Sequence, residues 1–334
     1  DHRPKGSVVS TLMSLLRRLL VALGLMVAVL AINFALIHAA PGDPASVIAG
    51  EMGGGDQAVI DSIKKAYGLD RSLPEQFMAY LSKSAQGDLG MSYTYNRPVS
   101  SLIAERIGPT LLLVTTALVA ASVVGTLLGV LASLQPQSLG SAVVTVLSLA
   151  GLAMPVFWTG ILLVIVFGKL WPVLPIAGMY DVRNYGASGW AVVRDVLHHL
   201  VLPALTLTLV YLAQYSRLAR ASMLEVLGSD YVRTARAKGL HEIVVVFKHA
   251  LRNALMPLVT VAGLQFGNLI SGAVLVETVF SWPGLGTLAL DAILGRDYPT
   301  LLGVLTFSCL FVIVANLLTD ASYRWIDPRL RSPR

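Results

Sequence analysis

Long apolar runs alternate with shorter polar segments along most of the chain. Six runs lack Asp, Glu, Lys and Arg and come close to the roughly 20 apolar residues that a helix needs to cross a bilayer. Backbone groups in lipid must hydrogen-bond within their own segment, so these runs predict membrane-spanning helices. They cover residues 19–37, 111–133, 141–168, 200–216, 254–276 and 300–319, of which the fourth is the shortest.

Two of the runs have features that change how they are interpreted. Pro155 lies near the middle of the third run and should kink its helix. The first run follows Arg17 and Arg18 and could be mistaken for a signal peptide. It is long for the apolar part of such a peptide, and five more runs follow it. We therefore expect a polar tail over 1–18 and a first span, retained in the protein, over 19–37.

The distribution of basic residues predicts how the spans are oriented. With a cytoplasmic N-terminus, 15 Lys and Arg fall in cytoplasmic segments and four in the two short outer loops, 169–199 and 277–299. Cytoplasmic loops carry such an excess, so we expect both termini and the segment 217–253 in the cytoplasm. The long region 38–110 is then external. Apolar residues at helical spacing predict short helices in it near 56–67 and 74–85.

Composition agrees with a membrane protein. The chain has 334 residues, of which 55% are hydrophobic and only 13% charged, whereas soluble domains carry about 25% charged residues. The net charge of +6 is accounted for by cytoplasmic loops, so no nucleic-acid partner is expected. The single cysteine, Cys309, excludes an internal disulfide framework.

Motifs for enzymatic chemistry are missing from the sequence. Gly168-Lys169 lacks the glycine spacing and the following Ser or Thr of a phosphate-binding loop. His198 and His199 are adjacent and would point apart on a helix, which disfavours a metal site. The acids nearest the spans, Glu277 and Asp320, lie at their ends. Ion-coupled carriers usually place charges within spans, so energy for uphill transport should come from another subunit.

Two alternatives of other classes remain at this point. A self-sufficient carrier or channel would act without partner subunits. An intramembrane hydrolase would need Ser271 as its nucleophile, but no histidine base faces it in the sequence. We expect no catalytic, cofactor or metal site on this chain.

The segment 217–253 is polar and lies between two apolar runs. It contains seven basic and three acidic residues, and each Arg or Lys at a bilayer centre costs about 2.5–3.5 kcal/mol on insertion scales. It must therefore lie outside the hydrocarbon. Gly239 fits a helix C-cap, which predicts a short helix ending at Gly239 and a second helix leading to Pro257. The small residues Ala235, Ala237 and Gly239 would let another surface approach closely. Composition alone fits a basic loop facing lipid headgroups equally well.

The motif "DYVRTARAKGL…KHALRNALMPLVT" resembles the cytoplasmic loop of ATP-binding-cassette importer permeases of the peptide/nickel subgroup. The general family loop has Glu-Ala-Ala where this chain has Arg233-Thr234-Ala235, and the subgroup's own version is closer. The resemblance spans about 40–330, and within the subgroup the chain is similar to the first permease. Further motifs that carry it are "PGDPA" (41–45), "YGLDRSLPEQF" (67–77), "GDLGMSY" (87–93), "RIGPTL" (106–111), "GLQFGNLISGAVLVETVFSWPGLG" (263–286) and "RDYPTL" (296–301).

The resemblance implies an all-α integral membrane protein with six transmembrane helices and the type I ABC importer permease fold, multi-pass in the bacterial cytoplasmic (inner) membrane. Its core permease domain would cover 111–334. It implies a second homologous permease subunit in a heterodimer, two ATPase subunits that bind ATP and Mg, and an extracytoplasmic substrate-binding protein. The loop would form a coupling helix in a groove of an ATPase. The implied ATPase-coupling residues are Tyr231, Arg233, Thr234, Ala235, Arg236, Ala237, Lys238 and Gly239.

The resemblance favours a peptide as substrate, and nickel chelates, glutathione and haem remain alternatives. In such systems the binding protein largely sets selectivity. Small residues at Gly125 and Gly129, and at Gly263 and Gly267, have the spacing of close helix packing within a membrane.

Overall fold

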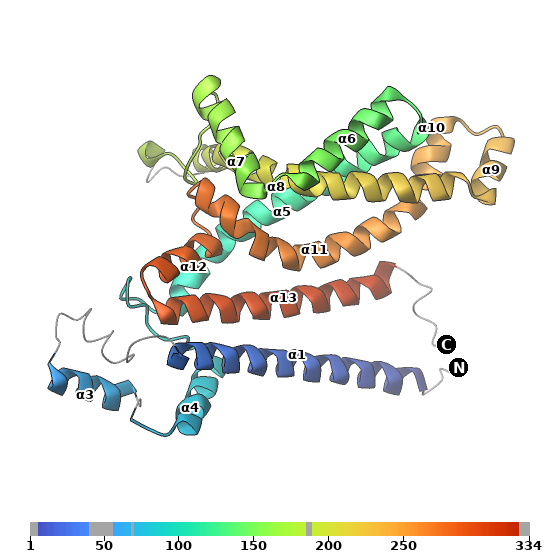
Figure 1. The fold of residues 1–334 in the computed structure, drawn as a ribbon. Helices are drawn as coiled ribbons and strands as arrows, with labels where there is room; N and C mark the ends of the chain where they lie inside the picture. Colours follow the sequence, from blue (N-terminus) through green and yellow to red (C-terminus); the bar gives the residue numbers. More distant parts are fainter. Residues whose placement is uncertain (1–5, 40–55, 68–69, 185–188, 327–334) are drawn as a thin grey trace. The chain divides into compact units, whose positions relative to one another are not determined.

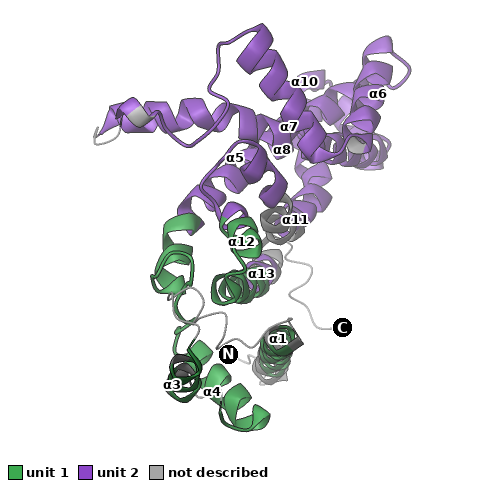
Figure 2. Cartoon of the chain, turned by 60° about the vertical axis from the view of Figure 1, so that its left-hand side comes forward, with its two compact units in different colours: residues 1–106, 288–314, 332–334 green, residues 107–287, 315–331 purple. Residues whose placement is uncertain are grey.

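The computed structural model describes residues 6–39, 56–67, 70–184 and 189–326, and within them the regular elements are helices (Figure 1). The motif at 41–45 lies outside the described residues. The chain divides into two compact units (Figure 2). Unit 1 contains residues 1–106, 288–314 and 332–334, and unit 2 contains residues 107–287 and 315–331.

The helices follow the chain in the order that the apolar runs predict. Two further segments, Ile165–Leu170 and Val245–Ala250, are π-helical, and Val182–Asn184 is a 3₁₀ turn. The α-helices are α1 (Gly6–Ala39), α3 (Gln57–Tyr67), α4 (Leu73–Ala85), α5 (Val99–Leu134), α6 (Leu139–Ala153), α7 (Val156–Val164), α8 (Trp190–Leu227), α9 (Asp230–Ala237), α10 (Glu242–Val244), α11 (Leu251–Val279), α12 (Leu285–Leu294) and α13 (Tyr298–Ile326).

The number of predicted spans is confirmed. Within the described residues, five helices are long and apolar enough to cross a membrane, and six spans result if the bent pair α6–α7 counts as one. That pair bends by 103°, more sharply than the expected kink. Met154 is extended and Pro155 caps the start of α7. A proline disfavours helical backbone at the residue before it, which explains why the helix breaks there.

Several helices extend beyond the apolar runs that predicted them. α1 begins at Gly6, inside the expected polar tail, and α5 begins at Val99, inside the expected loop 38–110. α8 has 38 residues and is about 57 Å long, although its apolar run was the shortest. Pro257 lies inside α11 instead of ending the helix before it. Hydropathy marks the part of a helix suited to lipid, and helical backbone continues into polar sequence. The two short helices expected near 56–67 and 74–85 are present as α3 and α4.

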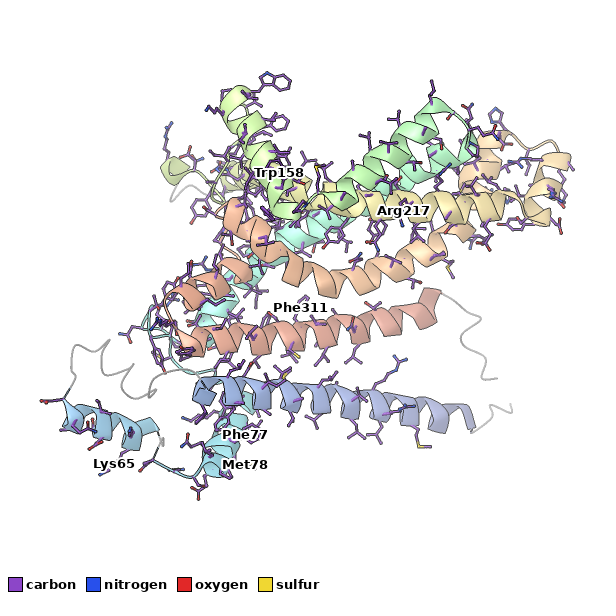
Figure 3. All side chains as sticks on the ribbon, in the orientation of Figure 1. Lys65, Phe77, Met78, Trp158, Arg217 and Phe311 are labelled. Carbon is purple, nitrogen blue, oxygen red and sulfur yellow. The ribbon has the colours of Figure 1, made fainter. Side chains whose placement is uncertain are left out.

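A buried amide joins α1 to α13 within unit 1. Asn33 is 2% exposed, and its side-chain nitrogen donates to Thr306 Oγ1 at 3.0 Å and to the Leu302 carbonyl at 3.4 Å. α4 packs on the same helix α1, where the ring of Phe77 lies 5.3 Å from that of Phe34. Figure 3 labels Phe77 on α4. These contacts fix the short helix α4 to the long apolar helix α1.

Close packing of α5 on α8 organises unit 2. A Cβ atom added at Gly125 would lie 2.7 Å from Tyr215 Cβ, and one at Gly129 would lie 2.6 Å from Ala219 Cβ. The glycine pair therefore brings the two helices together, as its spacing predicts. Gly263 is similarly close to Thr319, while the surroundings of Gly267 lie outside the description. Beyond the glycines, a hydrophobic core joins α5, α8, α11 and the turn that follows α11. It contains Leu113, Val114, Leu202, Leu207, Val276, Phe280 and Trp282.

Candidate functional site

The helix α9 packs through one face onto the rest of unit 2. Val232 and Ala235 are buried on this face. They join a hydrophobic cluster with Val130 of α5, Met223 of α8 and the π-helical segment Val245–Ala250. α9 is therefore held against the ends of two long helices, so a force applied to α9 would reach them.

The opposite face of α9 is exposed. The sequence predicts that the small side chain of Ala235 lets another surface approach. In the structure, Ala235 lies on the buried face, and its small side chain permits close packing within the chain's own cluster. The other seven residues that the resemblance implied for coupling are exposed together: Tyr231, Arg233, Thr234, Arg236, Ala237, Lys238 and Gly239.

Gly239 ends α9 by its backbone conformation. The helix ends at Ala237, two residues earlier than predicted, and Gly239 follows with a φ of +74°. Its N–H donates to the Arg236 carbonyl at 2.9 Å, and the Leu240 N–H donates to the Ala235 carbonyl at 3.4 Å. These two bonds form a Schellman motif, which favours glycine at this position. No atom would lie within 4 Å of an added Cβ, so the structure shows open space beside Gly239.

Polar contacts set which charges α9 presents. Arg236 Nη2 lies 2.7 Å from Glu242 Oε1, and this hydrogen bond raises the pKa of the Arg236 guanidinium. Arg233 lies 3.6 Å from Asp230 on the same exposed surface. Asn253 Nδ2 donates to the Tyr231 hydroxyl at 2.7 Å, which ties α9 to α11.

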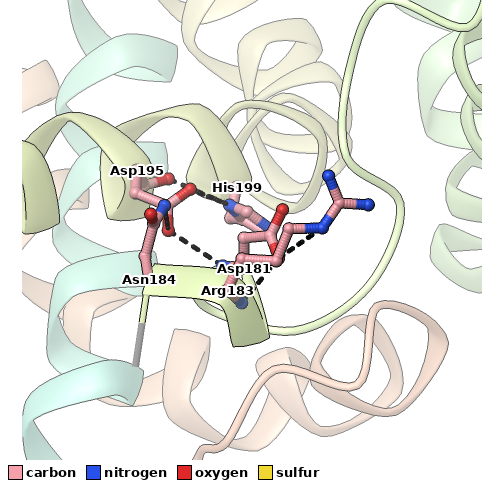
Figure 4. Close-up of polar contacts among 5 residues, drawn as sticks. All are labelled: Asp181, Arg183, Asn184, Asp195 and His199. Atoms are coloured by element: carbon pink, nitrogen blue, oxygen red, sulfur yellow. Dashed lines mark hydrogen bonds and ion pairs between the residues drawn. The ribbon is translucent and has the colours of Figure 1, made fainter. Parts of the chain in front are cut away.

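Asp195 organises the opposite end of α8 (Figure 4). Its Oδ2 accepts from the Asp181 backbone N–H at 2.8 Å and from Asn184 Nδ2 at 2.9 Å. Its Oδ1 lies 3.2 Å from Nδ1 of the buried His199. These contacts fix the turn 181–184 to the first turns of α8. Within the described residues, no group of three His, Cys, Asp or Glu could hold a metal ion.

Glu277 is a buried carboxylate that the sequence interpretation placed at a span end. It lies within α11, is fully buried, and accepts from Thr110 Oγ1 at 2.6 Å. It also accepts from the backbone N–H groups of Gly286 at 2.6 Å and Thr287 at 3.2 Å. The Leu285 N–H donates to Thr110 Oγ1 at 2.8 Å. The Glu277 carboxylate and the Thr110 hydroxyl thus accept hydrogen bonds from the first backbone N–H groups of α12. The helix dipole also favours negative charge at this end.

A second buried carboxylate, Asp297, has a similar role in unit 1. It precedes α13 and accepts from Thr300 Oγ1 at 2.7 Å and from the Tyr93 N–H at 3.2 Å. Asp297 thereby joins the motif at 296–301 to the motif at 87–93, and Glu277 joins 263–286 to 106–111. The spacing Asp297-x-x-Thr300 is a helix-start signal visible in the sequence. No sequence spacing predicts the contacts with residues about two hundred positions away.

Comparison with known proteins identifies the class. Residues 125–332 match the model of the family described as "Binding-protein-dependent transport system inner membrane component". Residues 11–114 match the model of the N-terminal region of such membrane components. The chain belongs to this family and is a multi-pass protein of the bacterial inner membrane. It is the membrane permease subunit of a transport system.

Two relatives show how far the similarity extends. A Brucella ovis protein named as a peptide permease is 42% identical over 317 residues, which cover 95% of this chain and 98% of that protein. The Escherichia coli "Dipeptide transport system permease protein DppB" is 38% identical, again over 95% and 98% of the two chains.

A solved structure supports the fold alone. The structure titled "Inward facing conformations of the MetNI methionine ABC transporter" matches with a TM-score of 0.52 at 18% identity. The match covers 68% of this chain and 96% of that one. It agrees with the importer permease fold implied by the sequence resemblance.

Proposed function

We propose that this chain forms half of the translocation pathway of an ATP-driven importer of di- or oligopeptides. The arrangement of α9 carries the coupling part of this proposal, because one face is buried on α5 and α8 while the other is free for a partner. The peptide substrate is supported by relatives of nearly equal length that are named as peptide and dipeptide permeases.

The proposed assembly has a second homologous permease subunit, two ATPase subunits and an extracytoplasmic substrate-binding protein. ATP and Mg bind to the ATPases, and this chain holds no cofactor. Both termini and α9 lie in the cytoplasm, as the basic residues predict. The turn 181–184 and α12 then lie toward the external side.

Coupling follows from how α9 is held. Closure of the ATPase dimer moves the exposed face of α9, and the buried face passes this movement to α5 and α8 through Val232 and Ala235. Close packing of α5 on α8 makes the helices move together. The permease pair then alternates between outward and inward access.

The exposed small residue Ala237 offers a direct test of ATPase docking. In Ala237→Trp, a large side chain lies on the exposed face and leaves the buried face of α9 unchanged. We expect co-purification of the ATPase and ATP-dependent peptide uptake in membrane vesicles both to fall at least about tenfold, which corresponds to 1.4 kcal/mol. The matched control is Ala58→Trp, at an exposed alanine of α3. Normal ATPase recovery with Ala237→Trp would contradict docking on this face.

Glutathione is a second candidate substrate. An Escherichia coli protein named "Glutathione transport system permease protein GsiC" is 40% identical over 95% of this chain. In the same vesicles, uptake of labelled dipeptide that excess unlabelled glutathione does not reduce would favour peptides. Preferential uptake of glutathione would assign the chain to that substrate.

A further inference from the structure

Two glutamine side chains meet between membrane-spanning helices of unit 2. Gln214 of α8 and Gln265 of α11 are both partly buried, and Gln265 Nε2 donates to Gln214 Oε1. The surrounding runs 200–216 and 254–276 contain no Asp, Glu, Lys or Arg. The glutamines thus place an uncharged polar pair within two apolar spans.

The pair leaves one kind of donor and one kind of acceptor available. The bond occupies an N–H of Gln265 and the oxygen of Gln214. Among the described residues, the two side chains make this one hydrogen bond, so the N–H groups of Gln214 and the oxygen of Gln265 have no protein partner there. Exchanging the oxygen and nitrogen of both amides leaves the same two kinds of group, so this conclusion does not depend on how the amides are oriented. Hydrogen-bonding groups left unpaired in lipid are costly, so this face should meet water or a polar ligand.

A comparison with Asn33 separates this pair from a packing contact. The Asn33 amide is 2% exposed and bonds two acceptors across its helix interface. Such full engagement is typical of polar residues that join membrane helices. Gln214 and Gln265 remain partly exposed. The N–H groups of Gln214 and the oxygen of Gln265 are not among the fully buried side-chain atoms that lack a hydrogen-bond partner. Their remaining groups can therefore be reached by a ligand.

We infer that Gln214 and Gln265 lie on the translocation path and bind a peptide group of the passing cargo. A Gln214 N–H donates to the cargo carbonyl, and the cargo N–H donates to the Gln265 oxygen. The peptide group is common to cargos that differ in side chains, and an uncharged site accepts acidic and basic peptides alike. This assignment rests on the proposed peptide transport and adds two residues that recognise the cargo in the membrane.

The test compares a tripeptide with its depsipeptide, in which one peptide N–H is replaced by an ester oxygen. The complete transporter with its binding protein is reconstituted in proteoliposomes, as wild type and as Gln214→Leu/Gln265→Leu. Discrimination by the binding protein is the same in both samples and cancels when their amide-to-ester uptake ratios are compared. We expect that ratio to fall about threefold to tenfold in the double variant, because one hydrogen bond no longer distinguishes the cargos.

Controls separate the possible failures. Gln137→Leu, at an exposed glutamine outside the spans, should keep the wild-type ratio. An unchanged amide-to-ester uptake ratio in the double variant would overturn the inference. If the ratio is unchanged and less transporter assembles, the pair contacts another helix or the second permease instead of the cargo. If the double variant does not assemble, Gln214→Met and Gln265→Met are measured separately in the same way, because one of the two removes the acceptor in either orientation of the amides. Absence of peptide uptake by the wild type would instead contradict the proposed function.

Discussion

Buried carboxylates fix the chain at positions where sequence motifs far apart come together. Glu277 has no exposed surface and satisfies a hydroxyl and two backbone N–H groups at once. Gly284 and Gly286 lie so close to its carboxylate that a Cβ at either position would collide with it. The last two glycines of the motif at 263–286 are therefore explained by the space that this carboxylate takes.

Replacing Glu277 tests this role. In Glu277→Gln, an N–H₂ group must face at least one of the three donors, which leaves that donor without an acceptor. Leaving a buried donor unpaired costs about 1–3 kcal/mol, so we expect a lower thermal unfolding midpoint in detergent. Glu105→Gln removes an acid whose ion pair with Arg97 is solvent-exposed and should change the midpoint little. Equal midpoints for wild type and Glu277→Gln would show that the carboxylate is not needed for stability.

At the scale of the helices, the sequence predicts the spans well and their ends poorly. The six apolar runs overlap the candidate membrane spans, because lipid imposes a strong requirement for apolar side chains. The fifth candidate span, Glu242–Gly263, starts earlier than its run and includes the end of the segment 217–253, which the sequence predicts to lie outside the hydrocarbon. The true starts of α1, α5 and α8 lie in polar sequence. There, packing within the chain decides whether a helix continues. The resemblance located α9 in the sequence, whereas its buried face depends on contacts with Val130 and Met223, which no local pattern reveals.

The end of α9 allows a prediction about a whole element. Gly239 has a positive φ, and no other atom of the chain crowds it. The backbone conformation, and not a lack of space, is therefore the reason for glycine at this position. Asn tolerates this conformation and β-branched Val does not. We expect Gly239→Val to speed hydrogen exchange at the α9 amides, and Gly239→Asn to leave it near the wild-type rate. Equal exchange in both variants would show that the Schellman motif does not hold α9 in place.

At the scale of the whole molecule, the relatives and the sequence agree on a membrane subunit. The family match and the relatives of equal length place the chain among membrane components of binding-protein-dependent systems. The sequence has no phosphate-binding loop, and its apolar runs carry no charged side chain for ion coupling. In the proposed importer, this chain supplies helices that form the path, and the free energy for uphill movement enters from the ATPases through the exposed face of α9.

Reconstitution distinguishes this picture from a self-sufficient carrier. We expect the purified chain alone in liposomes to show neither saturable ATP binding nor peptide uptake, with or without a proton or sodium gradient. Adding the second permease, the ATPases and the binding protein should produce uptake that depends on ATP. The Ala237→Trp variant, assembled in the same way, should lose most of that uptake because its ATPases are not docked. Gradient-driven uptake by the chain alone would contradict the importer proposal, since a path without its own energy source cannot concentrate peptide.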